Sequence, residues 1–156
     1  MRAESLLLPF LAFLPDLKWT ELPKGPSERF ACSAVWNPRD GTMLLFAGEL
    51  KKGDGFDFFN DLWEFSPKES KWTEVRAEGK EPDRRGYHAA AWDTKQNVLW
   101  VFGGAGDGLT AKDDLWKFDP TAKKWTEVEG KGETPGARFS AALHFDPKKN
   151  RLLLFS

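Results

Sequence analysis

The chain repeats two blocks of sequence at a fixed interval. Asp61-Leu62-Trp63-Glu64-Phe65-Ser66-Pro67 recurs 53 residues later as Asp114-Leu115-Trp116-Lys117-Phe118-Asp119-Pro120. Lys71-Trp72-Thr73-Glu74-Val75 recurs at the same interval as Lys124-Trp125-Thr126-Glu127-Val128, and a partial copy, Lys18-Trp19-Thr20-Glu21-Leu22, lies one interval upstream. A period near 50 residues is typical of arrays in which each repeat is one structural unit. We therefore expect the chain to fold as copies of one unit.

Each unit contains four short apolar runs separated by turn residues. In the clearest copy the runs are 85–92, 98–102, 114–118 and 125–128. All four have strand length and none shows helical periodicity, so the pattern predicts a four-stranded antiparallel meander. Residues 105–112 form a longer polar loop between the second and third runs. Because such a sheet is apolar on both faces, it must stack on copies of itself.

Three features recur in the same order within these units. They are a Pro-x-x-Arg lead-in, a second run that ends at a glycine doublet, and a Phe followed after six residues by a Trp. One copy has Pro82 to Arg85, Gly103-Gly104 and Phe118/Trp125. The preceding copy has Pro26 to Arg29, Ala47-Gly48 and Phe65/Trp72, and the last has Pro135 to Arg138. In this order they resemble the kelch repeat of β-propellers, over roughly residues 17 to 156. Ala47 departs from the pattern, since it replaces the first glycine.

The resemblance implies an all-β fold, a segment of a kelch-type β-propeller. The alternative is a two-sheet β-sandwich, which also alternates short strands and turns. A sandwich would not explain why two blocks recur at one offset, so we favour the propeller. The expected units are residues 16–24 (partial), 25–77, 78–130 and 131–156 (partial), which together make about three four-stranded antiparallel blades.

About three blades are fewer than the four to eight that close a propeller, so we expect a truncated or incomplete ring. An open arc leaves sheet edges and aromatic faces in water, and both favour association. Three explanations stand. The chain is a fragment of a longer gene product, which we favour, or a homo-oligomer that completes a ring of six blades, or a degenerate remnant.

Residues 1–15 allow two interpretations. The apolar run 6–14 behind Arg2 suits the h-region of a signal peptide and is too short for a transmembrane helix. It also suits a degenerate third strand, because it precedes Trp19 much as 63–67 precedes Trp72. The first interpretation, which we favour slightly, predicts a secreted or cell-envelope protein, and a cytoplasmic location stays open. The single cysteine, Cys32, does not decide the compartment and is expected to be a small buried residue.

Composition narrows the classes of partner. The 23 basic and 24 acidic residues are interspersed and give a net charge of -1, so the sequence offers no field for nucleic acid or an anionic membrane. No cluster of His, Cys and carboxylates has metal-ligand spacing, and we expect neither a metal nor a cofactor. With 40% hydrophobic and 14% aromatic residues, the chain has enough apolar mass for a core.

The arginines that open the units are candidate ligand-binding residues. If the resemblance holds, Arg29, Arg85 and Arg138 begin the inner strands and would converge on one mouth of the channel. Guanidinium groups arrayed in this way bind carboxylate, sulfate or phosphate through planar forks of donors. Tyr87 and His88 follow Arg85 and would add a hydroxyl and an imidazole to the channel mouth. The alternative is structural, with each arginine bonded to backbone carbonyls of a neighbouring blade.

A second candidate is the loop 49–60, which carries Phe56, Phe58 and Phe59 among polar residues. Three aromatic side chains in a polar loop either pack beneath it or form an exposed recognition edge.

We therefore predict a non-catalytic binding scaffold that recognises a partner protein or an acidic glycan through its loops and channel mouth. The alternative is a fragment of a sugar-acting kelch enzyme, similar to sialic acid epimerases or galactose oxidases, with its catalytic residues outside this chain. Copper oxidases of that kind need ligating tyrosines and a Tyr-Cys crosslink. One Tyr and one Cys without a matching pair do not provide them.

Overall fold

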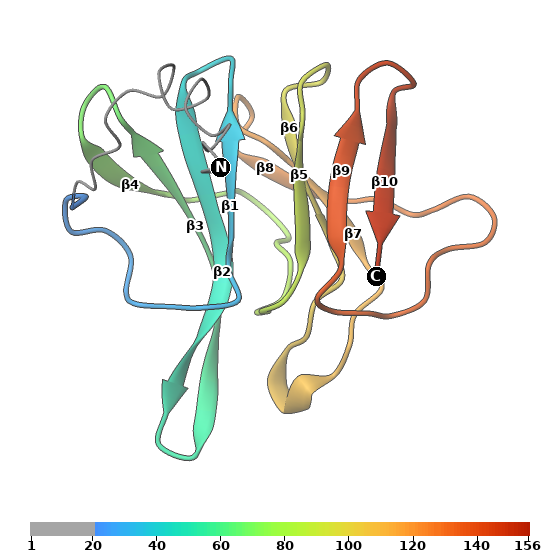
Figure 1. The fold of residues 1–156 in the computed structure, drawn as a ribbon, viewed down its shortest axis with the longest axis horizontal. Coiled ribbons are helices and arrows are strands. Elements are labelled where there is room, and N and C mark those ends of the chain that lie inside the picture. The colour runs from blue at the N-terminus through green and yellow to red at the C-terminus, as the bar shows by residue number, and fades with distance from the viewer. Residues whose placement is uncertain (1–20) are drawn as a thin grey trace, which may run out of the picture.

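The computed structural model of the protein describes residues 21–156 and consists of two four-stranded antiparallel sheets and one hairpin (Figure 1). The strands are, in the first sheet, β1 (Ser33–Asn37), β2 (Thr42–Lys52), β3 (Gly55–Ser66) and β4 (Lys71–Val75); in the second, β5 (Ala89–Asp93), β6 (Val98–Phe102), β7 (Leu115–Asp119) and β8 (Lys124–Glu127); and in the hairpin, β9 (Ala142–Asp146) and β10 (Arg151–Phe155). One turn of 3-10 helix, η2 (Asp107–Leu109), lies between β6 and β7. Each sheet is a meander in chain order, as the repeat predicted.

The two sheets and the hairpin stand side by side as successive blades of a propeller. The first strand of each unit lies beside the first strand of the next, so β1, β5 and β9 are neighbours across the blades (Figure 1). The prediction of an all-β, kelch-type segment of an incomplete ring is confirmed: residues 21–156 form two complete blades and half of a third. The predictions made for residues 1–15, and for Lys18 to Thr20, concern positions outside the described residues.

The tight turns of the blades share one local mechanism. Asp93 Oδ1 accepts hydrogen bonds from the backbone amides of Lys95 (2.8 Å) and Gln96 (2.9 Å), and Asn97 then takes a positive φ of 58°. Asn37 and Asp146 make the same pair of bonds in the first turns of their units. A short side-chain acceptor followed by a left-handed residue reverses the chain at low cost, which explains the Asp and Asn that precede each second strand.

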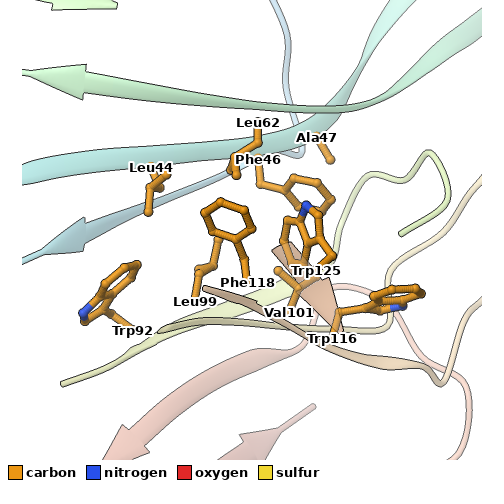
Figure 2. Packing of buried hydrophobic residues seen from close by; sticks show 10 residues of the cluster. All are labelled: Leu44, Phe46, Ala47, Leu62, Trp92, Leu99, Val101, Trp116, Phe118 and Trp125. Atoms are coloured by element: carbon orange, nitrogen blue, oxygen red, sulfur yellow. The ribbon is translucent and has the colours of Figure 1, made fainter. Parts of the chain in front are cut away.

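The core lies between the first and second blades (Figure 2). Trp125 of β8 packs on Phe118 of its own blade, with ring centroids 5.1 Å apart, and on Phe46 of the first blade at 4.8 Å. Leu44 and Leu99 complete this contact and are fully buried. Stacking therefore buries the blade faces, as the repeat requires.

Trp72 and Trp125 occupy equivalent positions, but they are not equally buried. Trp72 pairs with Phe65 in register and packs on it at 5.0 Å, as Trp125 does with Phe118. Trp125 is 3% exposed, whereas Trp72 is only partly buried. The difference arises because, among the described residues, no blade precedes the first one. The segment around Gly25 lies against the Trp72 indole instead.

The arginines do not begin the inner strands, which is a correction to the sequence analysis. The first strand of the second blade starts at Ala89, four positions after Arg85, because Tyr87 has a positive φ of 58° that a strand does not accommodate. Its amide donates to Ala31 O of the first blade, at 2.9 Å. Ala31 and Ser140, at the equivalent positions of their units, have the same left-handed backbone. The amide of Ser140 donates to Tyr87 O at 2.8 Å, so backbone hydrogen bonds between these residues join successive units.

The second residue of each glycine doublet bonds to the next unit. Gly48 donates to Arg85 O and Gly104 to Arg138 O, each at 2.9 Å. A Cβ on Gly104 would lie 2.7 Å from Gly86 O, so the approach excludes a side chain. Ala47, at the first position of its doublet, takes a φ of 55°, close to the 61° of Gly103. The turn is therefore kept despite the substitution.

The sequence predicts a loop at residues 49–60, and this prediction is wrong. These residues continue the sheet. β2 has 11 residues and β3 has 12, and their ladder extends from Glu49 opposite Phe58 to Lys52 opposite Gly55. Gly53 and Asp54 make the reversal. We call residues 49–60 the arm. It projects beyond the other blades at the lower edge of Figure 1.

Candidate functional site

The end of the blades that carries the arm also carries the predicted site residues. The lead-ins to β1, β5 and β9, the arm, and the loop 103–114 with η2 all lie at this end (Figure 1). The tight turns within each pair of first and second strands lie at the other end. The candidate site therefore lies at this end of the blades.

Arg29 is bound within its own blade. Its two terminal nitrogens donate to the two carboxylate oxygens of Asp61, at 2.5 and 2.9 Å, and Nη1 also donates to Ala47 O at 3.1 Å. The indole Nε1 of Trp63 donates to the same carboxylate at 2.7 Å. The planar fork is thus matched to a carboxylate, as such a group prefers.

Arg85 repeats this arrangement in the second blade. Its nitrogens donate to both oxygens of Asp114, at 2.6 and 2.7 Å, and to Gly103 O at 2.9 Å, while Trp116 Nε1 donates to Asp114 at 2.7 Å. The Arg85 side chain is fully buried. We call this arrangement of arginine, aspartate and indole the Arg-Asp-Trp triad.

The triads hold their aspartates in the ionised state. Burial raises the pKa of Asp61, but the hydrogen bonds from Arg29 and Trp63 and the arginine charge outweigh it, and the pKa lies below its usual value. The same balance of burial against Arg85 and Trp116 lowers the pKa of Asp114. In each triad the arginine and the aspartate are both charged, and their hydrogen bonds join the lead-in of the unit to its third strand.

Arg138 occupies the equivalent position in the third unit, with different partners. Its Nε donates to Gly136 O at 3.0 Å, as Arg85 Nε does to Asp83 O, and its Nη1 donates to Ser156 Oγ at 2.7 Å. Within residues 21–156 it forms no ion pair. The three arginines are each held by their own unit, and an anion-binding role for them stays a prediction.

Tyr87 and His88 form a polar cluster where β1 and β5 meet. The Tyr87 hydroxyl donates to Glu49 Oε1 at 2.8 Å, and His88 Nε2 lies 2.7 Å from Ser33 Oγ. Glu49 is 1% exposed, and its Oε2 has no hydrogen-bond partner among the described atoms. The bond to Glu49 raises the pKa of Tyr87, so its hydroxyl keeps its proton. A channel-mouth position for Tyr87 and His88 stays a prediction, and the structure shows that their side-chain partners are Glu49 and Ser33.

Burial determines the protonation of His88. Loss of solvent, assisted by the nearby charge of Arg85, lowers the pKa of His88 to about 3. The neutral ring packs edge-on against Phe46, at 5.2 Å between centroids. His88 therefore serves the interface between the blades as a neutral, packed side chain.

The three phenylalanines of the arm have different environments. Phe58 is 4% exposed, and a Cβ on Gly86 would lie 3.5 Å from its ring, so it packs under the second blade. Phe59 lies beneath the Arg29 guanidinium, 4.3 Å from its centroid. Phe56 is 46% exposed and meets Phe30, itself 42% exposed, edge to face at 6.0 Å. Recognition by these residues stays a prediction, and Phe56 is the one that solvent reaches most.

Several residues of this end were missed by the sequence analysis. Asp61 and Asp114 belong to the repeated blocks, but their pairing with the arginines was not predicted. The signal was present, because each aspartate opens an Asp-Leu-Trp block some 30 residues after its arginine. Glu49 carried a weaker signal, an acidic residue where the other complete unit has Ala105.

Residues 21–156 contain neither a group of side chains placed to hold a metal ion nor a membrane-spanning helix. In this part of the chain, no group of three or more His, Cys, Asp and Glu side chains is placed to hold a metal ion. None of its helices has the length and apolar character needed to cross a bilayer.

The comparison with solved structures supports the fold. A structure of YjhT superposes with a TM-score of 0.66 at 22% identity, covering 84% of this chain and 45% of that one. At this identity the likeness concerns the fold alone.

Curated relatives match over most of the chain. Schizosaccharomyces pombe Mei4-dependent protein 6 is 29% identical over 81% of the chain, and Chlamydomonas reinhardtii dynein regulatory complex subunit 7 is 33% identical over 67%. A Drosophila melanogaster leucine-zipper-like transcriptional regulator 1 homolog is 29% identical over 70%. The chain spans 19%, 9% and 11% of the length of these three proteins.

The family model for the KLHDC2/KLHL20/DRC7 Kelch-repeats domain matches residues 10–156. Together with the repeated blocks, the two meander blades and the doublet turns, this match shows that the chain belongs to the kelch-repeat family.

Proposed function

We propose that this kelch-repeat segment is a non-catalytic protein-binding module whose partner docks on the end that carries the arm. The observation that carries the proposal is the difference between the blades at this end. The first blade extends β2 and β3 to 11 and 12 residues, whereas β6 and β7 of the second have five each. Exposed phenylalanines with charged residues around them are the composition expected of a recognition surface.

The exposed surface of the arm has an aromatic centre and a charged rim. Phe30 and Phe56 form the centre, and Lys52 pairs with Asp57 beside them at 2.8 Å. Exposed aromatic anchors supply much of the affinity of protein interfaces, while rim charges steer association. Relatives named for a dynein regulatory complex and a transcriptional regulator agree with a role in protein assemblies.

The geometry favours a protein over an acidic glycan. An acidic glycan would need free guanidinium groups, and the forks of Arg29 and Arg85 already hold Asp61 and Asp114. If a glycan carboxylate displaced Asp61 or Asp114, the arginine would exchange one pair of hydrogen bonds for another and gain none. The aromatic surface needs no such exchange.

The test places a photo-crosslinking amino acid at Lys51, on the arm, and isolates the partner that it captures. Affinity for that purified partner is then compared between the natural chain, Phe56→Ser and Trp36→Ser. Trp36 is a matched control, since it is 50% exposed but lies beside the turn at the other end of the first blade. We expect Phe56→Ser to weaken binding about 30-fold and Trp36→Ser to have little effect. Equal effects of the two variants, or none from Phe56→Ser, would refute the proposal.

A further inference from the structure

The tight turns of the blades gather at one end of the molecule, opposite the arm. Because each unit is a meander, the turn between its first and second strands lies at the same end as the turn between its third and fourth strands (Figure 1). We call this end, formed by residues 37–42, 66–71, 93–98, 119–124 and 146–151, the turn end. These five segments contain nine Lys and Arg residues but only five Asp and Glu residues. The turn end is therefore positively charged, although the whole chain has a net charge of -1.

The local structure of the turns directs the two signs of charge differently. Asp93 accepts hydrogen bonds from the backbone amides of Lys95 and Gln96 and is only 1% exposed. Asp119 and Asp146 likewise each accept from two backbone amides of their own turns. These carboxylates face the backbone, whereas the lysine side chains that follow them are exposed to solvent.

The cations of the turn end are exposed and almost all unpaired. Each of the five turns contributes at least one exposed cation, namely Arg39, Lys68, Lys95, Lys123 and Lys148. None of these five side chains forms an ion pair within residues 21–156, where Arg151 alone among the turn-end cations has an acidic partner. The ammonium groups are therefore free to meet an external anion.

The cations are spread over an area. The turns that follow β1, β5 and β9 lie on the inner side of the units, where these strands are neighbours, and the turns that follow β3 and β7 lie on the outer side. All five reach a similar level at the upper edge of Figure 1. A nucleic acid would meet few of them, because its phosphates follow a narrow line. The turns 38–41, 67–70, 94–97, 120–123 and 147–150 also lack aromatic side chains on which a base could stack.

From this distribution of charge we propose that the turn end is a docking surface for a bilayer that contains anionic phospholipids. Lysine carries a compact, hydrated charge on a flexible stem, which suits attraction to many headgroups at once. Basic residues close to such a surface add to the attraction one by one. The turn tips consist of polar residues with Pro, Gly and Ala, so the protein adsorbs on the headgroups and inserts no apolar side chain.

This inference goes beyond the proposed protein-binding function, because it concerns the opposite end of the blades. A chain that rests on a bilayer through its turns would direct the arm away from the membrane (Figure 1). It also departs from the expectation that the net charge excludes an anionic membrane. Cations and acids are interspersed along the sequence, and the meander brings a surplus of cations to one end.

The experiment mixes the full 156-residue chain with vesicles and measures the bound fraction by sedimentation, with the chain alone as the baseline. One set of vesicles contains phosphatidylcholine only, and the other contains equal parts of phosphatidylcholine and phosphatidylserine. We expect saturable binding to the second set, none to the first, and loss of binding in about 0.5 M salt, which screens exposed charges. Absence of binding to the phosphatidylserine vesicles, or binding that persists at this salt concentration, would overturn the proposal.

Two double variants with the same change in net charge test whether the turn end makes the contact. Lys95→Gln/Lys148→Gln removes cations from two turns and keeps the backbone amides that form them. Arg84→Gln/Lys131→Gln removes two exposed cations outside the turn end. We expect about 25-fold weaker vesicle binding for the first, at about fivefold for each lysine, and little change for the second. Equal losses would mean that net charge alone governs binding and would refute a docking surface at the turns.

Other polyanions test the alternative partners. The chain is titrated with a short DNA duplex and with polyglutamate at the salt concentration used for the vesicles. Both should bind more weakly than the phosphatidylserine vesicles, because each contacts fewer of the five turns at once. Tighter binding of the duplex would assign the turn end to nucleic acid, and tighter binding of polyglutamate would assign it to an acidic protein. Either result would refute a bilayer as the partner.

Discussion

The two complete blades have nearly the same interior and different outer ends. Phe65 and Trp72 in one, and Phe118 and Trp125 in the other, pair in the same register and pack at almost the same distance. At the loop end, the first blade continues into the arm and the second returns through η2. The repeated residues therefore form the framework, and the residues that differ between units are the place to seek specificity.

The two blades also show that the burial of a repeated tryptophan depends on the neighbouring blade and not only on its position in the repeat. Trp72 and Trp125 share a block of sequence and a register. Among residues 21–156, only Trp125 packs on a neighbouring blade, and this difference accounts for their unequal burial.

The largest effect is expected from the two tryptophans. Trp125→Ala should lower the free energy of unfolding by about 3–5 kcal/mol, because it opens a cavity between two blades. Trp72→Ala should cost about 1–2 kcal/mol, since a partly exposed side chain loses less burial. Denaturant unfolding of both variants measures the difference. Equal losses would show that the faces of the two blades are covered to the same extent in solution.

The second effect compares Arg85, which pairs with an aspartate, and Arg138, which pairs with none among residues 21–156. Arg85→Ala leaves Asp114 without its ion pair and should cost about 3 kcal/mol, whereas Arg138→Ala, which breaks no ion pair in residues 21–156, should cost less than about 1 kcal/mol. Thermal and denaturant melts provide the measurement. A small loss for Arg85→Ala would remove the triad as a structural element and revive the anion-binding interpretation.

The fold could be predicted from the sequence because its signals are repeated. Asp-Leu-Trp, the doublet turns and Lys-Trp-Thr-Glu recur at one offset, and each recurrence supports the same local structure. The arm was not predicted, since the run Phe56 to Asn60 was interpreted as a polar loop. Its aromatic and polar residues suit a two-stranded ribbon, but the five charged residues and two glycines of positions 49–60 favoured a loop.

The site was harder to predict, because its contacts lie between units. The sequence placed Arg85, Tyr87 and His88 together, but it could not show that Tyr87 turns the chain with a positive φ. That backbone depends on Ala31 of the previous blade, which accepts the Tyr87 amide. Glu49 became visible only when the arm brought it to the Tyr87 hydroxyl. Contacts of this kind follow from blade stacking, which a single repeat does not encode.

The third effect tests the doublet turns against each other. A Cβ on Gly103 would lie 2.6 Å from Arg138 O, so Gly103→Ala should cost about 2 kcal/mol. Ala47→Gly, at the same position of the first blade, should change stability by less than about 1 kcal/mol, because relief of the left-handed alanine offsets the added freedom of the unfolded chain. If both changes prove neutral in chemical denaturation, the close approach of Arg138 relaxes in solution.

The smallest effect compares the two histidines, which differ in burial. His88 is 8% exposed between two blades, and His144 is exposed on β9. Burial lowers the pKa of His88 from 6.5 to about 3, so near neutral pH the ring is uncharged in both the folded and the unfolded chain. As the pH falls below 6.5 the unfolded chain binds a proton that the folded chain does not, and stability is lost until the pH approaches 3.

Between pH values of about 7.5 and 5.5 this linkage should remove roughly 1.4 kcal/mol from the free energy of unfolding. The pKa values of Asp61 and Asp114 lie below 3.8, so protonation of these carboxylates contributes only at lower pH. His88→Gln should remove this part of the pH dependence, and His144→Gln should preserve it, which denaturant unfolding at the two pH values can measure. An NMR titration of the His88 ring gives an independent check. If the His88 ring titrates near 6.5 in the folded chain, solvent reaches it and the proposed linkage is absent.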